Sequence, residues 1–394
     1  NNSDTDSPNS YWNNCYEAIA AANHALAAIE ANNFGKEIAA FKGEALVARA
    51  YAHFMLVNFF AKVYDYKKPE NNTSPGIPYV IEPETVVIKQ YDRGTVKSVY
   101  DNIRKDLEEG LALLDGNPAE WNVPKYHFTP AAAHAFATRF YLFTGEWQKV
   151  VDNANKIFAG GNFAGKLIPY NSTFKKMTFE EVHSVFSKAD QPYSLLINET
   201  YSGYQRWWDN RYAMGINVFQ NIYNGTTAAG AKFYNFGVSY GAPHYTTYIW
   251  KEFWYVTNAT ANTGFPRLMN RAEAYLELGN NAAGIADMNL MASNRIENYN
   301  PTNHAVTAAK SRLFFGVQDD KEALIQTVLQ FKQVGFMSMG LRWFDIIRKG
   351  ITVKHLVIAN DESESYIELK PEDPRRVFQI PQEAKLSGVE QNPR

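Results

Sequence analysis

One local pattern occurs twice in this chain and restricts its fold more than any other feature. Tyr141-Leu142-x-x-Gly145 and Tyr275-Leu276-x-x-Gly279 each end an alanine-rich segment, and each is followed by a second segment with helical spacing. Glycine lets the chain reverse where one helix ends, and small residues let paired helices approach closely. The small residues expected at these contacts are Ala133, Ala137, Ala154, Ala272 and Ala274. The pattern predicts repeated helical hairpins.

Apolar residues at three- and four-residue spacing predict the other helices. The predicted helices are residues 11–32, 43–63, 96–114, 130–145, 146–158, 319–334 and 341–349. The first of these is predicted because Tyr16, Ile19, Ala20, Asn23, Leu26, Ala27 and Ile29 recur at three- and four-residue spacing. Thr129 followed by Pro130 is a typical helix start. The fold class is therefore predicted to be mostly all-α.

The middle of the chain breaks the helical pattern. Between Tyr193 and Tyr255 there are 18 aromatic residues, interrupted by glycine, asparagine and proline. Short strands are predicted only for residues 194–197 and 232–238. We expect one domain over residues 1–394. Its parts are a helical body (11–160 and 265–350), an irregular ligand-facing region (161–264) and a loop-rich tail packed on the body (351–394).

Charge and cysteine content exclude several classes of protein. The formal net charge is only -2, so no strong positive field is available to gather nucleic acid. The single cysteine, Cys15, cannot form an intramolecular disulfide, and no cysteine or histidine cluster has the spacing of a metal site. No run of 18 apolar residues is present, so no membrane-spanning helix is predicted. Neither a metal nor a cofactor is expected.

The sequence contains no recognisable catalytic motif. It has no G-x-S-x-G, H-E-x-x-H, P-loop or dinucleotide-binding pattern. The acidic pairs Glu108-Glu109 and Glu180-Glu181 are interpreted as solvated surface, because adjacent residues of a helix point about 100° apart. His53 lies on an otherwise apolar helix and is interpreted as a satisfied core histidine. The chain is therefore predicted not to be an enzyme.

The aromatic-rich region offers a candidate binding site for a sugar. Flat apolar side chains beside short polar ones suit a pyranose, whose C–H face packs on an aromatic ring while its hydroxyls find polar partners. The candidate residues are Tyr204, Trp207, Trp208, Asp209, Arg211, Tyr245 and Trp250, with Tyr64 and Tyr66 as a further edge. The alternative is that these rings fill the core, although Trp207 and Trp208 are adjacent and cannot both face one core.

Several segments together resemble the SusD/RagB family of outer-membrane nutrient-binding lipoproteins. They are "GEALVARAYAHFMLVNFFAKV" (43–63), "PGIPYV" (75–80), "VYDNIRKDLEEGLALL" (99–114), "RAEAYLELGN" (271–280), "GLRWFDIIRKG" (340–350) and "FQIPQEAKLSGVEQNP" (378–393). Their order and spacing bracket most of the chain and leave residues 160–260 uncovered. The resemblance implies a body of four tetratricopeptide-like helix pairs bearing an irregular, aromatic-rich insertion.

The resemblance also implies a function and a location. Family members bind a glycan at the cell surface and deliver it to a SusC-like TonB-dependent transporter in the outer membrane, held by an N-terminal lipid anchor. Cys15 lies in "NNCYEA", which is no lipobox, so we expect the signal peptide and the anchor to be absent from this sequence. No binding residue of the family maps one-to-one here, and the candidate residues above depend on local chemistry alone.

Three alternatives stay open at the level of sequence. The ligand of a family member can be a peptide in place of a glycan. The helical hairpins can form a tetratricopeptide-type scaffold that binds another protein, with the aromatic residues as core. A helical glycoside hydrolase would require two carboxylates facing each other across an aromatic cleft.

Overall fold

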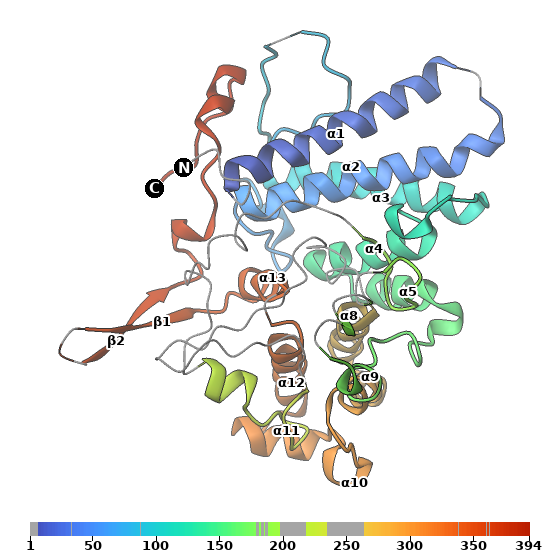
Figure 1. Cartoon of the computed structure of the whole chain (residues 1–394). Helices are drawn as coiled ribbons and strands as arrows, with labels where there is room; N and C mark the ends of the chain where they lie inside the picture. Colours follow the sequence, from blue (N-terminus) through green and yellow to red (C-terminus); the bar gives the residue numbers. More distant parts are fainter. Residues whose placement is uncertain are drawn as a thin grey trace. The chain divides into compact units, whose positions relative to one another are not determined.

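The computed structural model describes residues 7–32, 34–86, 88–178, 181–182, 185, 188–197, 218–234, 264–337, 339–359, 361 and 363–394. In this part the chain is mostly α-helical, as predicted (Figure 1). It forms two compact units: unit 1 comprises Asn1–Glu120 and Trp343–Arg394, and unit 2 comprises Trp121–Arg342. Each unit is described by itself.

Three long helices form most of unit 1. They are α1 (Pro8–Ala31), α2 (Ala39–Phe60) and α3 (Val96–Gly116), and short 3-10 turns occur at Lys36–Ile38 and Pro69–Asn71. Pro8 follows the N-cap Ser7, whose hydroxyl accepts from Ser10 N at 3.1 Å. The middle helix α2 packs against both α1 and α3. Its nearly continuous apolar sequence is explained by this position, because it is covered on both sides.

Two glycines bring α2 and α3 into close contact. A Cβ atom placed on Gly110 would lie 2.7 Å from Val47 Cγ2 and 2.8 Å from the Gly43 carbonyl oxygen. Real Cβ atoms do not approach other atoms this closely, and the neighbour on one side is backbone. Glycine at this crossing therefore sets the distance between the two helices.

Replacing Gly110 with alanine is expected to lower the stability of unit 1 by about 1–3 kcal/mol, because the added methyl group overpacks the crossing. Gly116→Ala is a matched control at the end of the same helix, where a Cβ atom would meet nothing within 4 Å. This control should leave stability unchanged or slightly raised. Hydrogen exchange of the α2 and α3 amides would measure both, and equal protection in the two variants would contradict the prediction.

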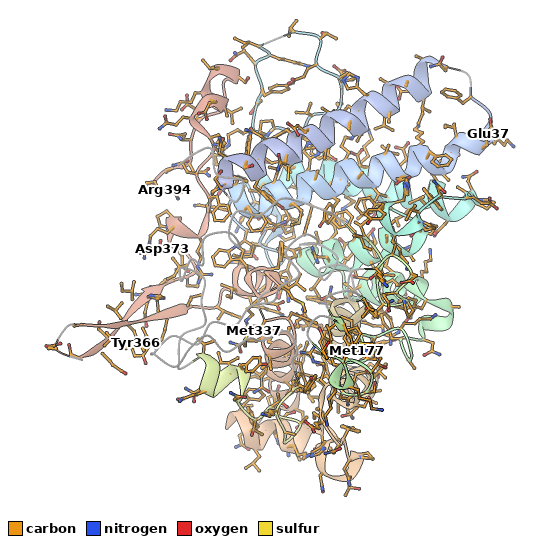
Figure 2. The ribbon with its side chains drawn as sticks, viewed as in Figure 1. Glu37, Met177, Met337, Tyr366, Asp373 and Arg394 are labelled. Carbon is orange, nitrogen blue, oxygen red and sulfur yellow. The ribbon has the colours of Figure 1, made fainter. Side chains whose placement is uncertain are left out.

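The C-terminal part of unit 1 contains a hairpin, in the segment that the sequence predicts to be a loop-rich tail. Strand β1 (Val353–Ile358) pairs antiparallel with β2 (Glu364–Leu369), and the hairpin follows helix α13 (Leu341–Arg348). Tyr366 lies on the outer part of this hairpin and is exposed (Figure 2). Arg376 ties the base of the hairpin to α13 by donating to the carbonyls of Ile346 (3.3 Å) and Leu369 (2.7 Å). Two short 3-10 turns complete the tail, at Pro374–Arg376 and Gln382–Ser387.

The predicted strands in the middle of the chain are not confirmed. Residues 194–197 and 232–234 form no strand, and residues 235–238 lie outside the described residues. Leu195, Leu196 and Ile197 are buried. Their apolar run therefore reflects core packing, which periodicity in so short a segment cannot distinguish from a strand.

Unit 2 is built from helical hairpins. Its helices are α4 (Pro130–Thr144), α5 (Trp147–Ile157), α8 (Gly264–Glu277), α9 (Asn281–Arg295), α10 (Pro301–His304), α11 (Ala308–Phe315) and α12 (Asp320–Gly335). Short helical turns lie at Pro124–Tyr126, Ala159–Gly161, Phe174–Lys176 and Phe219–Tyr223. Consecutive helices pack as α4 on α5, α8 on α9 and α11 on α12.

The repeated tyrosine–glycine pattern has the same structure at both of its positions. Gly145 and Gly279 have φ values of 71° and 81°, in the left-handed region. The next residue donates its backbone N–H to the tyrosine carbonyl five residues before it, from Glu146 to Tyr141 (3.0 Å) and from Asn280 to Tyr275 (2.8 Å). This is the glycine-based helix end that the pattern predicts. The five alanines expected at helix contacts are all buried.

Candidate functional site

Most of the sugar-binding residues predicted from the sequence lie outside the described residues. These are Tyr204, Trp207, Trp208, Asp209 and Arg211 in residues 198–217, and Tyr245 and Trp250 in residues 235–263. They remain predictions.

The two described candidates, Tyr64 and Tyr66, have different surroundings. Tyr64 is buried, and its ring stacks on Tyr100 with centroids 4.4 Å apart. Its ring therefore belongs to the core of unit 1. Tyr66 is half-buried, with the Lys67 ammonium 6.0 Å from its ring centre. Tyr66 stays a prediction.

A buried polar network joins α1, α2 and α3 inside unit 1. The Arg49 guanidinium donates to both oxygens of Asp106, with each N–O distance 2.7 Å. A third guanidinium nitrogen contacts Asn23 Oδ1 at 2.9 Å and the Ile81 carbonyl at 3.2 Å. Burial disfavours the Arg49 cation, but the hydrogen bonds and charge of Asp106 outweigh it and raise the Arg49 pKa. The ion pair is satisfied at both ends, as a buried pair requires.

His53 connects the same network to the segment that follows α2. Its Nδ1 lies 2.9 Å from the Arg49 carbonyl, and its Nε2 accepts the backbone N–H of Val80 at 3.1 Å. The ring also stacks on Tyr79 at a centroid distance of 3.8 Å. This arrangement fits a neutral imidazole protonated at Nδ1, and burial lowers the pKa of His53 to about 3. His53 is a satisfied core residue, as the sequence predicted.

These contacts fix an extended segment, residues 78–82, along α1. Tyr16 donates its hydroxyl to the Pro78 carbonyl (2.9 Å), and Asn23 donates its amide to the carbonyls of Val80 (3.1 Å) and Glu82 (3.3 Å). The loop between α2 and α3 continues from there beside α1 (Figure 1). The face of α1 that carries Tyr16 and Asn23 therefore holds a loop in place.

A hollow of about 180 Å³ opens beside this face, and we call it the α1 hollow. Helix α1 contributes Trp12, Tyr16, Ile19, Ala20 and Asn23 to its wall. The loop contributes Pro78, Val80, Glu82, Glu84 and Tyr91, and the C-terminal segment contributes Ala384, Ser387 and Val389. Aromatic and aliphatic groups thus lie beside hydroxyl and carboxylate groups, which is the combination that ligand pockets use for orientation and affinity.

The C-terminal wall of the α1 hollow is tied to the loop by hydrogen bonds. Tyr91 N donates to the Ser387 carbonyl (2.9 Å), and Gln90 Nε2 donates to the Leu386 carbonyl (2.9 Å). The buried side chain of Arg93 donates to the Gly76 carbonyl (2.8 Å), the Glu390 carbonyl (2.9 Å) and Asn392 Oδ1 (2.8 Å). The hollow is therefore a preformed feature of unit 1.

A second, more polar hollow of about 370 Å³ lies between α1, α2 and α3. Its charged lining includes Lys42 and Glu109, whose Nζ and Oε1 atoms are 3.3 Å apart. Tyr79 is its one aromatic lining residue, and the Tyr79 hydroxyl is already bonded to Asp106 at 2.5 Å. The α1 hollow is the better candidate for a ligand with an apolar face.

The acidic pair Glu108-Glu109 is exposed on α3, as predicted, and Glu108 lies 3.7 Å from Arg104 NH1. Of the pair Glu180-Glu181, Glu181 is exposed and Glu180 lies outside the described residues. Within the described ranges, no group of three histidine, cysteine or acidic residues has the geometry of a metal site. The same ranges contain no helix that is long and apolar enough to cross a membrane.

The N-terminal part of the sequence is similar to a known family. Residues 1–142 match a SusD-like family model described as "Starch-binding associating with outer membrane". No curated protein matches the sequence.

Solved structures extend the likeness to nearly the whole chain. A SusD superfamily protein from Bacteroides vulgatus has 20% identity and a TM-score of 0.71, with 98% of this chain and 85% of that chain covered. Another from Bacteroides thetaiotaomicron has 19% identity and a TM-score of 0.66, with 97% and 85% covered. A laminarin-binding SusD-like protein has 17% identity and a TM-score of 0.59, with 98% and 86% covered. The predicted resemblance is confirmed, and the chain has the SusD fold.

Proposed function

We propose that this chain, with its SusD fold, captures a glycan at the outer face of an outer membrane without transforming it. The observation that carries the proposal is the fold, which extends over 98% of the chain and is shared with a laminarin-binding protein. The matching family model, whose description names starch binding and the outer membrane, supports the same function. Attachment to the membrane by a lipid anchor and delivery to a SusC-like TonB-dependent transporter are parts of the proposal.

The residues proposed to hold the glycan are those of the aromatic-rich region. Tyr204, Trp207 and Trp208 offer apolar faces, and Asp209 and Arg211 offer partners for hydroxyls. Tyr245, Trp250 and Tyr66 are proposed as further contacts. An aromatic contact contributes about 1 kcal/mol, so losing one such ring should weaken binding roughly fivefold.

The test is affinity electrophoresis through gels that contain soluble polysaccharides, laminarin and starch among them. We expect one glycan to retard the wild-type protein, and the Trp207→Ala/Trp208→Ala variant to migrate more freely. Phe34→Ala is the control, because Phe34 is an exposed aromatic residue (52%) in the connection between α1 and α2. Circular dichroism confirms that each variant is folded.

Three outcomes would contradict parts of the proposal. Release of reducing sugar from the retarding glycan would identify a hydrolase. Retardation lost equally in the Phe34→Ala control would remove the aromatic-rich region from the site. The absence of retardation by any glycan would favour a peptide ligand.

A further inference from the structure

The α1 hollow is separate in sequence from the aromatic-rich region to which glycan binding is assigned above. Its lining comes only from α1, residues 78–91 and residues 384–389, all of which belong to unit 1. The function proposed for residues 204–250 therefore leaves this hollow without a role.

The α1 hollow has room only for a small ligand. Pockets for drug-sized molecules measure about 300–1,000 Å³. The α1 hollow, at about 180 Å³, is smaller than these and suits a single ring. A longer glycan chain would place only one unit inside it.

The chemistry of the lining selects a ligand with one apolar face and several hydroxyls. Trp12 makes an edge-on contact with Phe60 (centroids 4.9 Å apart), and Trp12, Ile19 and Val80 all contribute apolar atoms to the wall. Trp12 and Ile19 are largely buried, and Val80 is half-buried. Such groups accept the C–H face of a pyranose. Carboxylate oxygens of Glu82 and Glu84, both exposed, can accept hydrogen bonds from sugar hydroxyls.

The acidic residues of the lining disfavour the binding of anionic ligands. Among the described residues that line the hollow, Glu82 and Glu84 carry the charge. Lys89 lies 3.8 Å from Glu82 and offsets one carboxylate. The Tyr91 hydroxyl donates to Glu84, and burial and this hydrogen bond raise the pKa of Tyr91, so it remains a donor. A uronate or sulfate ester would bring a second anion beside Glu84.

We propose that the α1 hollow binds one neutral pyranose unit, as a second glycan subsite that excludes acidic sugars. The inference rests on the proposed glycan-binding function and adds to it the class of sugar and a second place of contact.

The experiment blocks the hollow without removing any hydrogen bond. Ala20 lines the hollow and Ala21, the next residue of α1, is exposed and does not. Ala20→Phe therefore fills the site, and Ala21→Phe is the matched control. Saturation-transfer-difference NMR is recorded on the whole chain with methyl glycosides of glucose, galactose and mannose, and with methyl glucuronide.

We expect at least one neutral glycoside to receive saturation at its ring protons and methyl glucuronide to receive much less. Ala20→Phe should reduce the neutral signal at least fivefold, and Ala21→Phe should leave it unchanged. Glu84→Gln, which keeps one acceptor oxygen for the Tyr91 hydroxyl and removes the charge, should raise the glucuronide signal. Equal signals from wild type and Ala20→Phe, or equal signals from neutral and acidic glycosides, would overturn the proposal.

Failure of this inference and failure of the proposed function give different results. If Ala20→Phe retains both glycoside signals and retardation in glycan gels, while Trp207→Ala/Trp208→Ala loses retardation, glycan capture stands and the hollow is not a subsite. If the glycoside signal is lost only in Ala20→Phe but no polysaccharide retards the wild type, the hollow binds sugar and polysaccharide capture is wrong.

Discussion

Replacing Asp106 with alanine is expected to lower the free energy of unfolding of unit 1 by about 3–5 kcal/mol. The substitution leaves the Arg49 cation, which is 7% exposed, without its bidentate carboxylate partner. A buried charge that loses its partner keeps the full penalty of desolvation. Hydrogen exchange of the α2 and α3 amides would measure the change in unit 1 by itself, which whole-chain denaturation of two units would not do.

Two controls separate this effect from a general sensitivity of α3. Glu109 lies on α3, as Asp106 does, and Glu109→Ala removes its surface ion pair with Lys42 of α2, so a loss of less than about 1 kcal/mol is expected. The double substitution Arg49→Met/Asp106→Leu removes both charges and should recover much of the lost stability, because no buried ion remains. An Asp106→Ala variant as stable as Glu109→Ala would show that the ion pair adds little.

Acidification is expected to destabilise unit 1 through His53, by about 2–3 kcal/mol between pH 6.5 and pH 4.5. Burial lowers the pKa of His53 from its ordinary 6.5 to about 3 in the folded protein. Between these two pH values, His53 is therefore protonated in the unfolded chain and neutral in the folded chain. The stability that comes from keeping His53 neutral is fully present above pH 6.5, and it falls as the pH drops from 6.5 toward 3. Protonation of Nε2 would also break its hydrogen bond with Val80 N.

The substitution His53→Gln tests the source of this pH dependence. Its side chain cannot be protonated in this range, so the exchange rates of α2 amides should depend less on pH, after correction for intrinsic exchange. His24→Gln is the control, because His24 is exposed on α1. If His53→Gln and wild type lose the same stability between pH 6.5 and 4.5, another group is responsible.

Each unit contains a buried arginine with the same kinds of hydrogen-bond partner. In unit 2, Arg271 binds both oxygens of Asp287 (2.8 and 2.7 Å) and donates to Asn155 Oδ1 and the Gly161 carbonyl, each at 2.8 Å. Arg49 has the same set of partners: a bidentate aspartate, an asparagine oxygen and a backbone carbonyl. The sequences Arg-Ala-Tyr-Ala and Arg-Ala-Glu-Ala, which begin at residues 49 and 271, are the visible trace of this repeat.

The sequence by itself determined most of the helices, although the short helices α10 and α11 are not among those predicted. Helix positions follow from spacing, and the helix ends follow from residues such as Thr129, Gly145 and Gly279, whose conformations depend on neighbours a few residues away. The hairpin of β1 and β2 was missed although both strands are local. Its strands are largely exposed on both faces, so they lack the alternation that marks a half-buried strand.

Only the tertiary structure decided where the α1 hollow lies and which residues line it. Trp12, Glu84 and Ser387 are far apart in the chain, and no local pattern connects them. The spacing on α1 predicts a helix, but it does not predict that one face of this helix holds a loop, because periodicity shows which residues share a face but not what covers it. Tyr64 and Tyr66 illustrate the same limit. They are two residues apart and chemically alike, yet the packing of Tyr100 against Tyr64 places that ring in the core and leaves Tyr66 half-exposed.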